Sequence, residues 1–196
     1  MEGWRKYKLG EIITLKYGKD HKKLSDGFYP VYGSGGIMRY GNSYIYDQPS
    51  ILIPRKGSLN NMMFIDKPFW TVDTMFWSII NDKMVLPRFL YYALSKYDFA
   101  SLNVGSAVPS LTVPVIENIE IIIPSISEQK QILSTLVPLD DKIALNTRIN
   151  DNLIFICILL VLNFTENQIV ATICIIQMRT DIKLMPIESF QYLSVA

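Results

Sequence analysis

The spacing of apolar residues changes abruptly near residue 125, and this change limits the folds open to the chain. Before it, short runs of aromatic and branched residues are separated by Gly, Pro, Asn and Asp, which is typical of short strands joined by turns. After it, apolar residues recur four and three positions apart, which is typical of a helix. The sequence therefore predicts an α+β fold, in which a mostly β domain precedes a long helix of the coiled-coil type.

The β region, residues 1–125, contains several strand candidates and one small helical element. The runs most typical of strands are Tyr44–Tyr46, Ile51–Ile53, Met75–Ile80 and Ile119–Ile123. A helix is expected at Pro87–Leu94, because proline is favoured in a first helical turn. Its apolar face would consist of Leu86, Phe89, Leu90, Ala93 and Leu94.

Residues 126–153 have the pattern of one long helix, with Ser125 to Glu128 as its start. A narrow stripe at coiled-coil spacing is formed by Ile132, Leu136, Leu139, Ile143, Asn146, Asn150 and Leu153. This stripe predicts a partner or homodimer helix. The same residues also fit a helix that packs on its own domain with Ile149 facing the core. Pro138 is expected to kink the helix or to split it in two.

Residues 154–196 form an atypical hydrophobic tail. The run Ile154–Leu162 is apolar all round, and no clean period follows it. Two explanations fit this composition: a shift of reading frame that replaced the original C-terminus, or a buried hydrophobic hairpin or oligomer interface. The run is much shorter than the roughly 20 residues that cross a bilayer, so no membrane partner is expected.

Nothing in the sequence indicates a catalytic or metal site. The single histidine, His21, lies beside two lysines, and Cys157 and Cys174 fit no zinc spacing. There is no nucleophile with a nearby base, no phosphate-binding loop and no dinucleotide fingerprint. We therefore expect a chain without catalytic residues, metal or cofactor of its own. The polar N-terminus has no signal-peptide pattern, and nothing about the two cysteines suggests secretion, so we expect a reducing compartment, the cytoplasm.

The polar features that remain are three loops. The net charge is only +1, so a nucleic-acid partner requires clustered rather than excess basic residues. Glycine and small polar residues let a loop approach a phosphate closely, and Arg or Lys at a strand exit can contact phosphates or guanine edges. The first loop contains Gly33, Ser34, Gly35 and Gly36; the second contains Arg55, Lys56, Gly57 and Ser58; the third contains Ser106, Ala107 and Pro109. Each of them could also be an ordinary turn.

Taken in order, these segments resemble one half of a type I restriction–modification specificity subunit. The resemblance runs from about Trp4 to Leu153 through WRKYKLGEI, YPVYGSGGI, ILIPRKG, FWTVDTMFW, GSAVPSLT, IIIPSISEQKQIL and LDDKIALNTRINDNL. The last two segments are the most specific. They resemble the family's boundary between a target-recognition domain and its conserved helix.

The resemblance implies sequence-specific recognition of double-stranded DNA by a subunit that catalyses nothing. Complete family members carry two recognition domains, one for each half of a split site, separated by two antiparallel helices that dock modification (methyltransferase) subunits. It further implies that partner subunits supply the chemistry, with S-adenosylmethionine for methylation and ATP and Mg for the restriction motor. On this basis the loops listed above are expected to bind DNA.

Two departures from the family and two other classes of function stand beside this interpretation. Pro54 occupies a position where the family often has glycine, and the sequence from Ile154 onward no longer follows the family. A stand-alone nuclease would need clustered acidic residues, yet Asp66, Asp73 and Asp82 are spread along the sequence. A protein-interaction module would use Trp70, Phe76 and Trp77 as a surface, although these aromatics are better explained as core.

Overall fold

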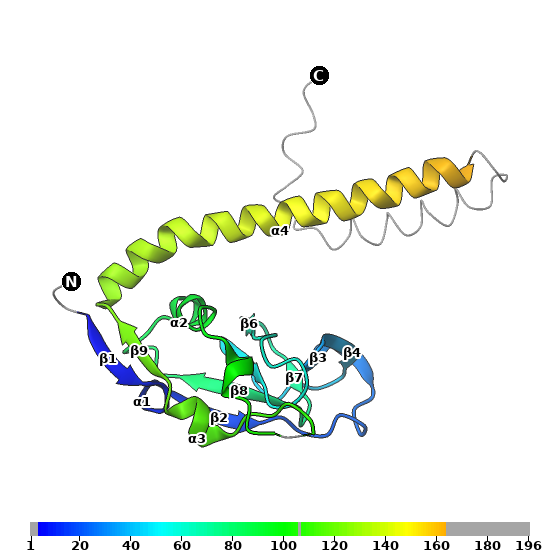
Figure 1. Cartoon of the computed structure of the whole chain (residues 1–196). Coiled ribbons are helices and arrows are strands. Elements are labelled where there is room, and N and C mark those ends of the chain that lie inside the picture. The colour runs from blue at the N-terminus through cyan, green and yellow to red at the C-terminus, as the bar shows by residue number, and fades with distance from the viewer. Residues whose placement is uncertain (1–3, 106, 164–196) are drawn as a thin grey trace. The chain divides into compact units, whose positions relative to one another are not determined.

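The computed structural model describes residues 4–105 and 107–163, and Figure 1 shows the arrangement of their elements. The chain divides into two compact units, Met1–Leu136 and Val137–Ala196. In chain order the elements are β1 (Arg5–Lys8), α1 (Leu9–Ile12), β2 (Ile13–Tyr17), β3 (Asp26–Gly33), β4 (Gly36–Gly41), β5 (Ser50–Pro54), β6 (Met63–Ile65), β7 (Trp70–Thr71), β8 (Met75–Ile80), α2 (Pro87–Leu94), a 3-10 turn (Phe99–Leu102), α3 (Val113–Glu117), β9 (Glu120–Ile123) and α4 (Ile126–Asn163). The predicted α+β class is confirmed.

Three small sheets build the first unit. The largest has the strand order β2-β8-β5-β6 and the second has the order β4-β3-β7, while β1 pairs with β9. Every pairing is antiparallel except that of β3 with the short strand β7. The sequence ends of the β domain therefore meet in one ladder, since β1 opens the domain and β9 closes it (Figure 1).

The central strand β5 is buried along its whole length and serves two cores. Ile51 and Ile53 belong to the main core, whereas Leu52 belongs to a second, smaller cluster with Trp77. Successive side chains of a strand point to opposite faces, so a strand covered on both sides reads as a continuous apolar run. This is why the sequence pattern located β5 well.

Two buried serines join β5 to β8. Ser50 Oγ donates a hydrogen bond to the carbonyl of Ser78 at 2.7 Å, and Ser78 Oγ accepts one from the backbone N–H of Ile51 at 2.9 Å. Both serines are fully buried. Because buried hydroxyls without partners are costly, this reciprocal pair lets two polar residues sit in an apolar interior.

One prediction from the sequence is wrong, and another is excluded in part. Tyr44–Tyr46 is not a strand; Tyr46 makes only an isolated bridge to Phe69, and its ring packs against Trp77 with a centroid distance of 4.7 Å. The aromatic residues of this segment are used for ring packing rather than for a ladder. Of the two outcomes expected at Pro138, a kink or a split of the long helix, the split is excluded, because α4 runs without interruption from Ile126 to Asn163.

Helix α4 begins with a reciprocal cap. Ser125 Oγ accepts a hydrogen bond from the backbone N–H of Glu128, while Glu128 Oε2 accepts bonds from the backbone N–H and the hydroxyl of Ser125 at 3.0 and 2.8 Å. This is a capping box, which satisfies N–H groups that a helix start leaves free. The predicted helix start is confirmed. Residues 154–163 continue α4, and the rest of the predicted tail, residues 164–196, lies outside the described residues.

Candidate functional site

The three loops selected from the sequence come together in the structure. The backbone N–H of Gly57 donates to the carbonyl of Pro109 at 3.2 Å, and the N–H of Leu111 donates to the carbonyl of Arg55 at 2.9 Å. The side-chain amide of Asn61 donates to the carbonyl of Ser34 at 2.6 Å. We call Gly33–Gly36, Arg55–Ser58 and Ala107–Pro109 the loop surface. Ser106, which was also predicted here, lies outside the described residues.

Gly57 is the point where the first two loops touch. Its φ is +90°, a conformation that residues with a side chain rarely adopt, and a Cβ at this position would lie 3.1 Å from Ser34 Oγ. Gly36 also has a positive φ, of 115°, but nothing lies within 4 Å of the Cβ it lacks. The positive φ favours glycine at both positions, and at Gly57 a Cβ would in addition crowd the hydroxyl of Ser34.

Two cations project from the exit of β5. Arg55 is half-buried, and its guanidinium carbon lies 5.6 Å from the centroid of the Tyr17 ring. Lys56 is exposed, and its backbone pairs with Ser110 in an isolated bridge. Stacked arginine and exposed lysine are the two side-chain types best suited to polyanion contact.

A fourth segment, which the sequence did not single out, borders the loop surface. A hollow of about 660 Å³ is lined by Asp20, His21, Lys22, Gly33, Ser34, Gly35, Met38, Val72, Asp73 and Thr74. Lys22 is exposed beside it, and the backbone N–H of Lys22 donates to Asp20 at 3.0 Å. That hydrogen bond lowers the pKa of Asp20, so the carboxylate stays ionised and partly offsets the nearby positive charge. The His-Lys-Lys run at 21–23 was the available signal for this segment.

The third loop is held by the side chain of Asn103, a residue that precedes it in the sequence. Asn103 Oδ1 accepts hydrogen bonds from the backbone N–H groups of Gly105 and Ser110, both at 2.8 Å, and its Nδ2 donates to the carbonyl of Gly105. Asn103 also lines a second hollow of about 370 Å³, together with Gly57, Ser58, Leu59, Asn60, Asn61, Ala100 and Pro109. Side-chain amides can thus fix a loop that has no regular secondary structure.

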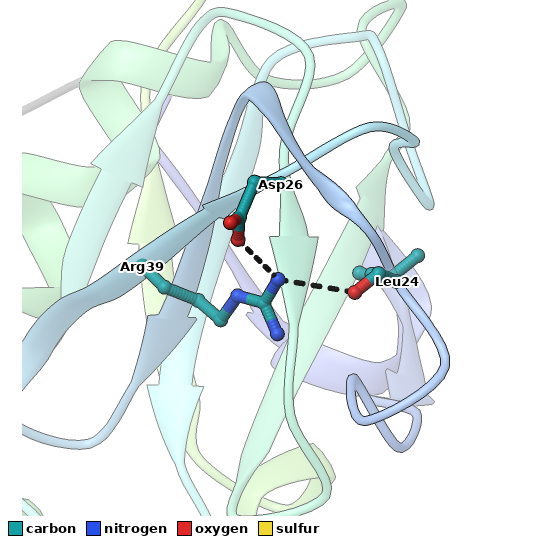
Figure 2. A network of polar contacts seen from close by, with 3 residues as sticks. All are labelled: Leu24, Asp26 and Arg39. Carbon is teal, nitrogen blue, oxygen red and sulfur yellow. Dashed lines mark hydrogen bonds and ion pairs between the residues drawn. The ribbon is translucent and has the colours of Figure 1, made fainter.

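Arg39 is a cation that the fold uses internally. Figure 2 shows its guanidinium between Asp26 and Leu24, with Nη2 donating to Asp26 Oδ1 at 2.8 Å and to the carbonyl of Leu24 at 3.0 Å. The two bonds tie β4 to the segment that leads into β3. Because its charge is neutralised by Asp26, Arg39 is a weaker candidate for binding an anion than Arg55 or Lys56.

The aromatic residues weighed as an interaction surface are mostly interior. Phe76 and Trp77 are buried, while Trp70 is half-buried and its indole N–H donates to the carbonyl of Lys19 at 3.1 Å. Within the described residues, no group of three or more His, Cys, Asp or Glu side chains is arranged to hold a metal ion. In that same part of the chain, no helix is both long and apolar enough to cross a membrane.

The predicted stripe on α4 divides into two parts. Ile132 is half-buried and packs against the main core of the β domain. In the second unit Leu139, Ile143 and Leu153 are each more than half exposed, and Asn146 and Asn150 are exposed as well. Leu136, the last residue of the first unit, is half-buried. Ile149, the alternative core residue, is 45% exposed.

Comparisons with known proteins agree on one family. Residues 1–153 match the family described as type I restriction modification DNA specificity domain. The chain is 32% identical over 183 residues to the type I restriction enzyme HindI specificity subunit of Haemophilus influenzae. This alignment covers 78% of this chain and 39% of that protein. The matched family range ends where the sequence departs from the resemblance, at residue 153.

Solved structures show the same fold. The S subunit of a type I restriction–modification system from M. genitalium aligns with a TM-score of 0.66 at 20% identity, covering 76% of this chain and 43% of that one. A second solved structure comes from work on complex assembly and conformational transition of the type I R-M system. One of its chains aligns with a TM-score of 0.61 at 16% identity, and the alignment covers 78% of this chain and 42% of that one. The chain thus spans about two fifths of the length of these relatives.

Proposed function

The chain belongs to the type I restriction–modification DNA specificity family, and from this premise we propose that its β domain recognises a specific sequence in double-stranded DNA through the loop surface. Family membership agrees with the expectation of a specificity component rather than a catalytic one. The single observation that carries the proposal is the convergence of the three loops, with Arg55 and Lys56 at their centre.

The loop surface offers both kinds of contact that DNA recognition needs. Backbone N–H groups and lysines suit phosphates, which set the position of a protein on the duplex, while a planar guanidinium suits the edge of a guanine. Arg55 is the candidate for base contact, and Lys56 and Lys22 are candidates for phosphate contact. The net charge of +1 fits this division, because only the local cluster needs to be basic.

We further propose that α4 mediates assembly. The exposed residues Leu139, Ile143 and Leu153 provide an apolar seam for a second helix, either from another copy of this chain or from a relative. Two copies paired antiparallel would present two identical recognition domains about a two-fold axis, and would favour a palindromic split site. Modification and restriction subunits would be the other partners and would bring S-adenosylmethionine, ATP and Mg. We expect this assembly to be located in the cytoplasm.

A selection experiment tests the proposed function. The purified chain is incubated with a pool of random duplexes, and bound molecules are sequenced after repeated rounds. We expect one short motif to be enriched, and binding to that motif to weaken steeply as salt concentration rises. A pool that stays random after selection would refute sequence recognition, and magnesium-dependent cleavage of plasmid by the pure chain would favour the nuclease alternative.

A further inference from the structure

The side chain of Arg55 is held by an aromatic ring and not by hydrogen bonds. Within the described residues its guanidinium has no hydrogen bond or ion pair, and its Nε is buried without a partner. The guanidinium lies over the ring of Tyr17, whose centroid is 5.6 Å from Arg55 Cζ. Among the described residues, this ring is the candidate group for orienting the guanidinium in the free protein.

Tyr17 is itself anchored to the core. Its ring meets the ring of Phe76 edge-on, with a centroid distance of 5.1 Å and an interplanar angle of 65°, and Phe76 is only 1% exposed. Its backbone pairs with Phe76 in the β2–β8 ladder, and its carbonyl accepts a hydrogen bond from the Trp77 indole at 3.2 Å. Tyr17 is nevertheless 55% exposed, so it is not itself a core residue. It connects the packed interior to the loop surface.

The backbone of Arg55 is fixed as well. Its N–H donates to the carbonyl of Thr74 at 2.8 Å, and its carbonyl accepts from the N–H of Leu111 at 2.9 Å. Both ends of the side chain are thus placed before any ligand arrives: the main chain by two hydrogen bonds and the guanidinium by the ring. A guanidinium that lies over an aromatic ring keeps its N–H donors available for a ligand, because the ring takes up none of them.

We infer that Tyr17 is the positioning residue for Arg55: its ring holds the guanidinium in one plane, so that the terminal N–H groups meet the DNA already oriented. The inference rests on the proposed function, because it assigns Arg55 a contact with DNA. Free arginine side chains lose rotamer freedom on binding, and a group that is ordered in advance avoids part of that loss. A guanidinium whose N–H donors have a fixed orientation also discriminates between bases better than a flexible charged side chain does.

Four variants of the full chain test the inference, with fluorescence anisotropy on the duplex selected by the wild type and on a scrambled duplex of equal length. Tyr17→Ala should weaken binding to the selected duplex by about 3-fold to 10-fold, and should weaken binding to the scrambled duplex less. Tyr17→Phe, which keeps the ring, should bind within about 2-fold of the wild type. Arg55→Lys, which keeps the charge but loses the planar fork, should lose discrimination as Tyr17→Ala does. Tyr40→Ala removes a tyrosine of similar exposure, 51%, on another sheet, and should change nothing.

A second measurement keeps the test independent of folding defects. In the NMR spectrum of the free wild type, the side-chain protons of Arg55 should be shifted upfield by the Tyr17 ring, and this shift should vanish in Tyr17→Ala while core methyl signals stay in place. Tyr17→Ala binding like the wild type, or Tyr17→Phe failing like Tyr17→Ala, would overturn the positioning role alone. A wild type that prefers no sequence would overturn the proposed function as well.

Discussion

The side chain of Gln129 accepts a hydrogen bond from the backbone N–H of Leu86, with 2.7 Å between Oε1 and N. The same amide donates from Nε2 to the carbonyls of Met84 and Pro124, at 3.2 and 2.9 Å. Gln129 is fully buried, so one side chain satisfies three backbone groups. It joins the first turn of α4 to the segment that precedes α2, and so links the β domain to the start of its long helix.

Replacing Gln129 should therefore destabilise the first unit. Gln129→Ala would leave three backbone groups without their partner, which we expect to lower the free energy of unfolding by about 2–3 kcal/mol. Urea denaturation measures this directly. Gln131→Ala is the matched control, because Gln131 lies in the same helix and is exposed. Equal effects of the two substitutions would mean that the buried amide does not hold the helix.

Gly57→Ala should destabilise the loop surface, because φ is +90° and the new Cβ would meet Ser34 Oγ at 3.1 Å. We expect a loss of about 1–3 kcal/mol in the free energy of unfolding or of local opening, measured by denaturation and by hydrogen exchange at the Leu111 amide. Gly35→Ala is the control: nothing lies within 4 Å of its Cβ position, and its stability should be unchanged. A stable Gly57→Ala protein with a protected Leu111 amide would contradict this account of the loop contact.

The capping box predicts a pH dependence with a definite sign. The hydrogen bonds from Ser125 lower the pKa of Glu128 below its ordinary value of 4.5 in the folded protein. The stabilisation is therefore present above that ordinary value and is lost as pH falls through the lower, folded-state pKa. Ser125→Ala should reduce the urea midpoint at pH 6 and should reduce it less at pH 3, whereas Ser127→Ala should show no such difference. If the difference in urea midpoint between the wild type and Ser125→Ala were the same at both pH values, an ionised Glu128 would be excluded from the cap.

Ile143→Asp should weaken self-association through α4. Ile143 is 62% exposed and lies on the predicted seam, so a charge there disrupts pairing while leaving the β domain folded. Sedimentation velocity of the full chain should show a dimer for the wild type and a dissociation constant roughly 10-fold higher or more for the variant. Leu145→Asp introduces the same charge at an exposed apolar residue off the seam and should remain dimeric. A wild type that sediments as a monomer would contradict the pairing.

Sequence patterns located the elements that are regular and densely apolar. Met75–Ile80 and Pro87–Leu94 are observed as predicted, because a run of β-branched and aromatic residues, or a proline before an apolar face, carries its own local signal. Helices α1 and α3 were missed, since four or five residues are too few to show a helical period. Tyr44–Tyr46 has the composition of a strand, but the ring of Tyr46 packs on Phe69 and Trp77, and the backbone of the segment forms one isolated bridge.

The sequence predicted which loops form the candidate site, but it did not predict the contacts that bring them together. The three loops were selected by their glycines and cations, yet the pairing of Lys56 with Ser110 spans more than fifty residues and has no local signal. The stacking of Arg55 on Tyr17 likewise joins β2 to the exit of β5, which the sequence places far apart. Gln129 was missed for a different reason. A polar residue in a helix pattern suggests a solvent-exposed position, and only the fold shows that its side chain bonds three backbone groups.

The central claim, that the loop surface recognises DNA through Arg55, is tested most directly by the binding free energies of Arg55→Ala for the selected and the scrambled duplex over a range of salt concentrations. Arg88→Ala is the control, because its guanidinium lies over Phe64 at the same distance of 5.6 Å but outside the loop surface. We predict that Arg55→Ala loses about 1–3 kcal/mol on the selected duplex and less on the scrambled one, and that Arg88→Ala discriminates as the wild type does. A folded Arg55→Ala protein with wild-type affinity and wild-type discrimination would contradict the account.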